Sequence, residues 1–248
     1  MIFLWVLCKV WRDVNFGMIK PNKKAHRLEV WLLKTASSAV LGDICTMKLI
    51  LASSSPRRAQ LLQDAGIAFE ICAPQLPEAR EPNETVEKMV ARLADAKAQA
   101  AAELLGDKFR GIIVGADTAV ELNGKIFGKP RDAADAFEML TTLSGRTHFV
   151  FTGVCVLQMP GRASRSAVEK TSVTFAPLDR KEIEAYVASG EPFDKAGGYA
   201  IQGRAARFIP HIEGCYFNVV GLPLARLHAL LAGLDLGDGT IGMKRTGA

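Results

Sequence analysis

The ten residues 49–58, with the sequence LILASSSPRR, constrain the fold of this chain more than any other segment. They begin as a short apolar run, which favours a buried strand, and then change to serines, a proline and paired arginines. Because serine is favoured just before a helix and proline in its first turn, a helix is predicted to follow and to end at Gly66. The segment therefore predicts a strand, a polar turn and a helix N-terminus in immediate succession.

This corner between strand and helix is a candidate anion site. The free N–H groups of a helix start, the positive end of the helix dipole and the guanidinium groups of Arg57 and Arg58 all favour phosphate there. A capped helix with two solvated arginines is the simpler interpretation, and the segment by itself leaves both open.

The rest of the chain mixes the two kinds of hydrophobic pattern. Strands are predicted at 67–72, 111–116, 149–157, 168–175, 208–210 and 216–220, and helices at 84–105, 132–143, 180–189 and 222–232. An Asn-Gly pair at 123–124 predicts a type I′ hairpin between 120–122 and 125–127. Hairpins and crossovers together predict an α/β fold around a mixed central sheet.

Residues 1–46 differ in composition from the residues that follow them. They hold all three tryptophans, together with seven of the 31 basic and three of the 26 acidic residues. We expect 1–46 to be a poorly ordered extension upstream of a natural start at Met47, 47–234 to be one domain, and 235–248 to be a flexible tail. A membrane-associating or targeting extension is the alternative, although its apolar start is too short to span a bilayer.

Charge and cysteine content argue against several classes of protein. Outside 1–46 the chain has 24 basic and 23 acidic residues, so its net charge of +5 comes mostly from the extension, and we expect neither a nucleic-acid nor a membrane partner. The five cysteines show no CxxC pair and no metal-ligand spacing. This usage is typical of a reducing compartment and predicts a cytoplasmic protein.

Candidate acid–base and metal-binding residues stand in two segments. Asp117 follows the apolar run 111–116, which places a carboxylate at the end of a predicted central strand, where such sheets bind ligands. It can bind a divalent metal, activate water or simply cap a turn, and Thr118 beside it offers a hydroxyl. Glu78 lies in an acidic loop of the kind that suits Mg²⁺, but nothing local distinguishes it from Glu81.

Basic and amide side chains provide candidate phosphate and base contacts. Lys97 stands near the apolar face of a predicted helix, and Lys129 follows the predicted hairpin in a Gly-Lys-Pro sequence. Either amine can neutralise phosphate charge in a transition state, while a lysine extending along the surface is the simpler interpretation of Lys97. In the glycine-rich segment 194–203, Lys195 and Gln202 can read a base edge, or the segment can be a structural turn.

Taken in order, these segments resemble the Maf family of nucleoside triphosphate pyrophosphatases. The matching pieces are SSSPRR at 53–58, Glu78 with Glu84, RLADAK at 92–97, GADT at 115–118, GKP at 128–130, SGRTH at 144–148, DKAGGYAIQG at 194–203 and NVVGLP at 218–223. The resemblance covers almost all of 47–231 and implies an elongated, two-lobed Maf/ITPase-like fold with a cleft between its lobes. It identifies 47–234 as a Maf-like pyrophosphatase domain.

The resemblance also implies a reaction and a set of roles. It implies hydrolysis of the α–β phosphate bond of a nucleoside triphosphate, here of the dTTP/UTP branch, to a monophosphate and pyrophosphate, with Mg²⁺ or Mn²⁺. By motif, Asp117 accepts a proton from water, Glu78 and Asp117 bind the metal, and Lys97 and Lys129 assist catalysis. The residues implied in substrate binding or base choice are Ser54, Arg57, Arg58, Thr118, Lys195 and Gln202.

Three questions stay open at the level of sequence: the function, the substrate and the oligomeric state. A nucleotide-binding regulator of cell division without catalysis is the alternative function, and it would not require Asp117. Modified pyrimidine nucleotides are further candidate substrates, and a homodimer is expected from the family rather than from any patch in the sequence.

Overall fold

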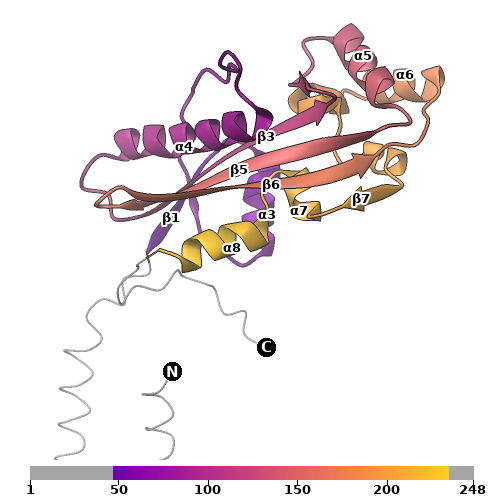
Figure 1. Cartoon of the computed structure of the whole chain (residues 1–248). Coiled ribbons are helices and arrows are strands. Elements are labelled where there is room, and N and C mark those ends of the chain that lie inside the picture. The colour runs from indigo at the N-terminus through magenta and orange to yellow at the C-terminus, as the bar shows by residue number, and fades with distance from the viewer. Residues whose placement is uncertain (1–46, 235–248) are drawn as a thin grey trace, which may run out of the picture. The chain divides into compact units, whose positions relative to one another are not determined.

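A computed structural model describes residues 47–234 of the chain (Figure 1). Its strands are β1 (Lys48–Ala52), β2 (Glu70–Ile71), β3 (Gly111–Leu122), β4 (Lys125–Phe127), β5 (Thr147–Met159), β6 (Ala163–Thr174) and β7 (His211–Glu213). Its helices are α3 (Pro56–Asp64), α4 (Val86–Leu105), α5 (Ala133–Leu143), α6 (Arg180–Ala188), α7 (Tyr216–Val220) and α8 (Leu224–Ala232), with short 3-10 turns η1 (Glu191–Asp194), η2 (Ala196–Gly198) and η3 (Arg204–Phe208). The predicted extension and tail lie outside the described residues.

The strands form one mixed sheet, as predicted from the sequence. Its order is β2-β1-β3-β5-β6-β7, with β4 paired to β3. β1 runs parallel to β2 and β3, whereas β3, β5, β6 and β7 are antiparallel to their neighbours. The hairpin prediction is also confirmed, because Asn123 and Gly124 both have the positive φ of a type I′ turn, at 51° and 81°.

The predicted end of the central strand at Asp117 was wrong. β3 continues to Leu122, because its second half pairs with β5 and buries Val120 and Leu122. The parallel pairing does end near Asp117: Ala52, the last residue of β1, lies opposite Gly115. The chain therefore leaves β1 for the polar turn at the level of the carboxylate.

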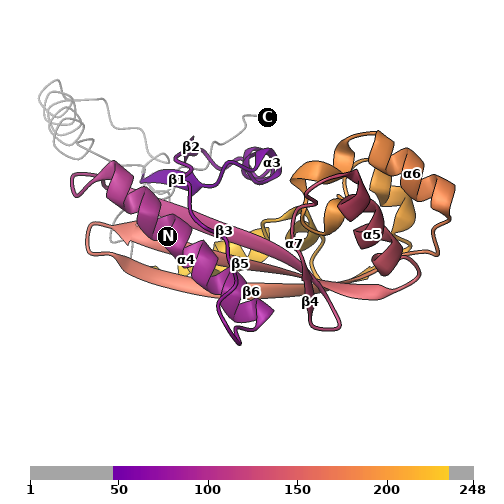
Figure 2. The same cartoon turned by 90° about the horizontal axis from the view of Figure 1, so that it is seen from above.

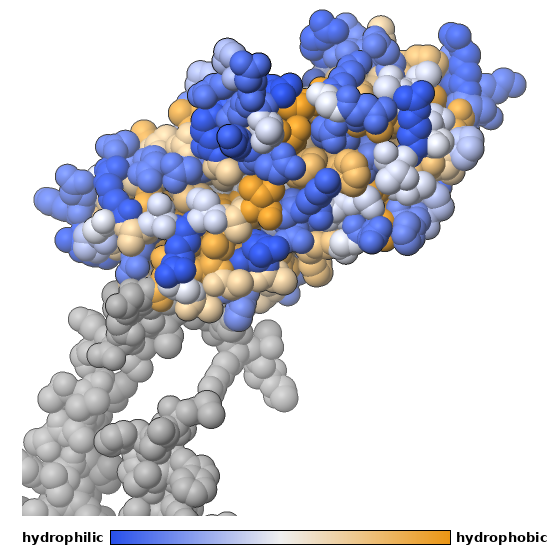
Figure 3. Space-filling model, in the orientation of Figure 1, coloured by the Kyte–Doolittle hydropathy of each residue, from blue (hydrophilic) through white to orange (hydrophobic). Residues whose placement is uncertain are grey.

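Alternate residues of the strands bury against helices on opposite faces of the sheet. Ile50 and Ile113 pack with the alanines of α4, and Leu51 and Val114 pack with α3 and α8. In Figure 1, α4 lies along one face and α8 along the other. The face seen in Figure 3 is mixed, with hydrophilic residues widespread and apolar ones in smaller groups.

Two glycines let the backbone of α4 lie directly against the sheet. A Cβ atom on Gly115 would stand 2.0 Å from the carbonyl oxygen of Ala94, and one on Gly153 would stand 2.2 Å from that of Val90. A side chain at either position would push the helix away. The glycines therefore allow the close approach that brings Lys97 of α4 to the sheet.

A second core forms around α5 and α6 at the far ends of β3 and β5 (Figure 2). It contains an aromatic cluster in which the buried His148 ring bonds through Nε2 to the Tyr199 hydroxyl at 2.7 Å. Burial lowers the pKa of His148 to about 4, so this histidine is a neutral core residue at pH 7. None of the helices in 47–234 is long and apolar enough to cross a membrane.

Three short strand predictions differ from the structure. The predicted strand at 67–72 shortens to β2, while 208–210 begins inside η3 and continues without a strand, and 216–220 is helix α7. Short apolar runs fit a strand or a buried helical turn equally well, so their surroundings decide. In α7, the buried Asn218 amide donates from Nδ2 to the Val150 carbonyl at 3.0 Å and to Thr171 Oγ1 at 2.9 Å, which fixes the helix on β5 and β6.

Candidate active site

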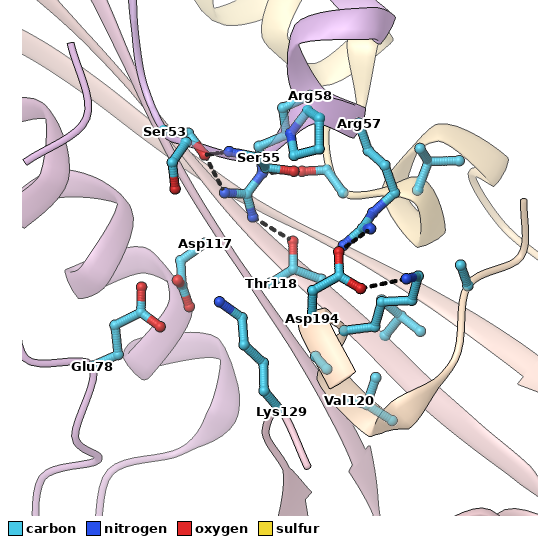
Figure 4. A pocket seen from close by; sticks show the side chains of 18 of the residues that line it. Ser53, Ser55, Arg57, Arg58, Glu78, Asp117, Thr118, Val120, Lys129 and Asp194 are labelled. Carbon is cyan, nitrogen blue, oxygen red and sulfur yellow. Dashed lines mark hydrogen bonds and ion pairs between the residues drawn. The ribbon is translucent and has the colours of Figure 1, made fainter. Parts of the chain in front are cut away.

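A cavity of about 570 Å³ opens where β1 passes into α3, between the two groups of helices. Its lining includes all ten residues that the sequence pointed to, from segments far apart in the chain. They are Ser54, Arg57, Arg58, Glu78, Lys97, Asp117, Thr118, Lys129, Lys195 and Gln202. Figure 4 shows the arginines facing Glu78, Asp117 and Lys129 across this space. The carboxylate of β3 and the Ser-Pro-Arg-Arg corner thus share one cavity.

Lys97 joins two carboxylates at the floor of the cavity. Its ammonium nitrogen lies 2.6 Å from Asp117 Oδ1 and 2.5 Å from Glu78 Oε1. The lysine is buried and does not extend along the surface, contrary to the simpler interpretation of its sequence position. The structure also separates the two acids of the loop, because Glu78 enters the cavity whereas Glu81 contacts Arg92 outside it, at 3.4 Å.

These two carboxylates have different proton affinities. Burial raises the pKa of Asp117 above its usual value, although the charges of Lys97 and Arg58 act in the opposite direction. Partial burial also acts to raise the pKa of Glu78, but the hydrogen bond and charge of Lys97, helped by the charge of Lys129, lower it below its usual value. Neighbouring carboxyl groups whose pKa values shift in opposite directions are typical of active sites in which the two groups have different roles.

Arg58 is held by the protein on all sides of its guanidinium group. It donates from Nε to the Gly221 carbonyl at 2.8 Å, from Nη1 to Ser53 Oγ at 2.8 Å and from Nη2 to Thr118 Oγ1 at 2.9 Å. The side chain is buried, and this burial lowers its pKa despite the nearby carboxylates. Arg58 therefore fixes the corner of the cavity, and its charge acts on the cavity from a rigid position.

Arg57 makes a different contact, with a residue that the sequence reasoning had not singled out. Its Nη1 atom lies 3.0 Å from Asp194 Oδ2, and Asp194 also pairs with Lys195 (Figure 4). The Lys195 ammonium donates further to the Glu191 carbonyl at 2.5 Å. The only sequence signal for Asp194 was its place at the start of the glycine-rich segment. It puts a negative charge among the cations that line the cavity.

Three of the predicted residues present side chains without a protein partner. Within 47–234, Ser54, Lys129 and Gln202 are exposed and make no side-chain hydrogen bond or ion pair. Ser53, a further residue missed in the sequence, accepts from Arg58 and from the backbone N–H of Ser55. The unpartnered side chains leave a hydroxyl, an amine and an amide available to a ligand.

The donor set for a metal ion consists of two carboxylates. Glu78 and Asp117 both contact the Lys97 ammonium, so their oxygens already surround one cation. In the part of the chain that the structure describes, no group of three or more His, Cys, Asp or Glu side chains converges on a metal position. Mg²⁺ commonly takes one or two carboxylates and completes its shell with water and substrate phosphates, so the residues present fit such an ion.

A mixed α/β sheet with a cation-lined cavity beside one buried and one half-exposed carboxylate is typical of the class of protein that binds and processes a polyanion. The family model for Maf-like proteins matches residues 48–234, and the chain belongs to this family.

Three relatives carry the description dTTP/UTP pyrophosphatase. The protein of Carboxydothermus hydrogenoformans is 49% identical over 73% of this chain and 96% of its own length. Those of Pelotomaculum thermopropionicum and Acinetobacter baylyi are 50% and 51% identical, over 74% and 73% of this chain and 95% and 96% of their own lengths. Among solved structures, the Staphylococcus aureus Ham1 protein matches with a TM-score of 0.41 and 16% identity, covering 75% of this chain and 98% of that one.

Proposed function

We propose that this chain is a nucleotide pyrophosphatase that hydrolyses dTTP and UTP to the monophosphate and pyrophosphate. The relatives that support this substrate class align over nearly their whole length. The observation that carries the proposal is the Lys97 ammonium, which holds Asp117 and Glu78 in the same cavity as Arg57 and Arg58. A triphosphate requires cations to balance its charge and a carboxylate to direct water, and this cavity brings them together.

In the proposed reaction, Asp117 is the proton acceptor. A water oxygen bonds to the α phosphorus and the bond from that phosphorus to the bridging oxygen breaks. Pyrophosphate leaves with the bridging oxygen, and the water proton passes to the Asp117 carboxylate. Because burial raises its pKa, this carboxylate takes up a proton more readily than an exposed aspartate. Lys97 and the exposed amine of Lys129 neutralise charge on the phosphates.

Glu78 and Asp117 are the residues that would hold a divalent cation, Mg²⁺ or Mn²⁺. Such an ion would supply charge neutralisation at the phosphates and polarise the P–O bonds. The low pKa of Glu78 keeps it ionised and therefore able to serve as an oxygen ligand at neutral pH. Lys97 contacts both carboxylates, so it supplies the balancing positive charge between them.

The opposite wall of the cavity is the proposed site of base choice. Gln202 is exposed and its amide has no partner within 47–234, so it offers both a donor and an acceptor to a pyrimidine edge. Arg57 and Thr118, which the Maf resemblance also ties to base choice, line the same cavity. Ser54 and Lys195 complete the proposed substrate contacts.

Turnover of dTTP and UTP by wild type and Asp117→Asn tests the proposal. We expect the variant to lose about a hundredfold to ten-thousandfold in kcat while still binding nucleotide. Asp64→Asn is a suitable control, because Asp64 lies on α3 outside the cavity and, among residues 47–234, its side chain bonds to Gln60 alone. Nucleotide binding without turnover by wild type would favour the non-catalytic regulator, and full activity of Asp117→Asn would remove this aspartate from the reaction.

A further inference from the structure

An ion pair between a partly exposed arginine and a buried glutamate stands at the start of helix α4, outside the cavity. Arg92 donates from Nε to Glu84 Oε1 at 2.7 Å and from Nη2 to Glu84 Oε2 at 2.8 Å, which is a two-bond, parallel arrangement. The Glu84 side chain is buried, and the hydrogen bond from Arg92 is the main cause that lowers its pKa to about 2. Neither residue lines the cavity, so neither is available to touch a bound nucleotide.

The Arg92–Glu84 pair holds the backbone of the loop that carries Glu78 through hydrogen bonds. Arg92 Nη2 also donates to the carbonyl of Ala79, the residue next to Glu78, at 3.0 Å. On the carboxylate side, Glu84 Oε2 accepts from the backbone N–H of Glu81 at 3.0 Å, and Arg80 donates to the Glu84 carbonyl at 2.7 Å. The loop 79–84 is thus tied at several points to the first turns of α4.

The Glu78 side chain makes few contacts of its own with the rest of the described residues. Its side chain is half exposed, and its ion pair with Lys97 is the one side-chain contact it makes within the described part of the chain. It lies in the loop 72–85, which has no helix or strand of its own. Lys97 and Arg92 both belong to α4, so the helix that supplies the ammonium also fixes the backbone beside the carboxylate it meets.

We propose that Arg92 and Glu84 are positioning residues that act through Glu78. This inference rests on the proposed function, because it assigns the pair to the placement of a carboxylate used there. A lysine at position 92 keeps the charge but cannot make the forked contact with Glu84 and reach the Ala79 carbonyl at the same time. When the two-bond contact between Arg92 and Glu84 is lost, the loop is no longer held in place. The Glu78 carboxylate then moves away from Lys97 and from a cation held with Asp117.

The test is a double-mutant cycle between positions 92 and 78, with kcat and KM for dTTP as the first readout. Arg92→Lys is expected to lower kcat about 10- to 100-fold in the wild-type background, and to have no further effect in Glu78→Gln. Glu84→Gln should behave like Arg92→Lys. Arg226→Lys is the matched control, since Arg226 pairs with Glu169 at 2.8 Å between α8 and β6, away from the cavity.

A second readout keeps the inference separate from the reaction itself. Binding of Mn²⁺ to the protein with a non-hydrolysable dTTP analogue, followed by electron paramagnetic resonance, should weaken about 10- to 100-fold in Arg92→Lys but not further when Glu78→Gln is present. Thermal unfolding identifies variants that fail to fold. Equal effects of Arg92→Lys in both backgrounds, or an effect no larger than that of Arg226→Lys, would overturn the positioning role. A wild type that binds Mn²⁺ with this coupling but does not hydrolyse dTTP would overturn only the proposed function.

Discussion

The guanidinium group of Arg57 and the carboxylate of Asp194 meet at 3.0 Å and join α3 to η1 across the mouth of the cavity. Asp194 pairs at the same time with Lys195. A phosphate that approaches Arg57 therefore competes with a carboxylate that already occupies this position. In the proposed binding mode, a substrate phosphate at Arg57 displaces this carboxylate.

Replacing Asp194 with Asn should accordingly tighten nucleotide binding. The pair with Arg57 is partly exposed to solvent, and exposed pairs contribute about 0.2–1 kcal/mol, so we expect KM for dTTP to fall by about fivefold or less. Steady-state kinetics and pyrophosphate inhibition measure the change. A rise in KM would instead show that Asp194 orients Arg57 and Lys195 for the substrate.

The pH dependence of kcat/KM should report Asp117. A proton acceptor must be ionised, and burial raises the pKa of Asp117 above the usual 3.8, so activity should fall with decreasing pH at a midpoint above that value. Glu78 does not produce this midpoint, since its pKa lies below the usual 4.5. A pH profile of wild type and Glu78→Gln measures the effect; a midpoint that moves with Glu78→Gln would assign it to the loop glutamate.

Gly115→Ala should strongly destabilise the fold. The new Cβ would stand 2.0 Å from the Ala94 carbonyl oxygen, so α4 must move away from β3, at a cost of about 1–3 kcal/mol. Urea unfolding measures the free energy. Gly128→Ala is the control, because a Cβ there meets no atom of the described residues within 4 Å. Activity of the folded fraction should also fall, since Lys97 moves with the helix.

The Glu84–Arg92 pair should contribute to acid sensitivity. A carboxyl whose pKa falls from 4.5 to about 2 on folding stabilises the protein above pH 4.5, and this contribution disappears as the pH falls towards 2. The melting temperature of Glu84→Gln should therefore lie below that of wild type at neutral pH and approach it in acid. Melting curves between pH 7 and about 2.5 test this, and a constant difference would contradict it.

The sequence predicted which segments meet in the cavity better than it predicted the elements that carry them. Asp117 and Arg57 stand beside changes of pattern that are visible locally, where an apolar run meets polar residues. Glu78 could not be separated from Glu81, because the choice depends on how Arg92 and Glu84 close the loop. Asp194 was missed because its importance lies in a partner 137 residues away.

The continuous strands β3 and β5 set a limit on how the cavity can change. β3 places Ile113 in the core under α4 and Val120 in the core under α5, and β5 does the same with Leu157 and Val150. The two cores therefore share two unbroken strands. We therefore expect a nucleotide to enter by exchange of side-chain partners, such as that between Arg57 and Asp194, rather than by a hinge motion of the two cores.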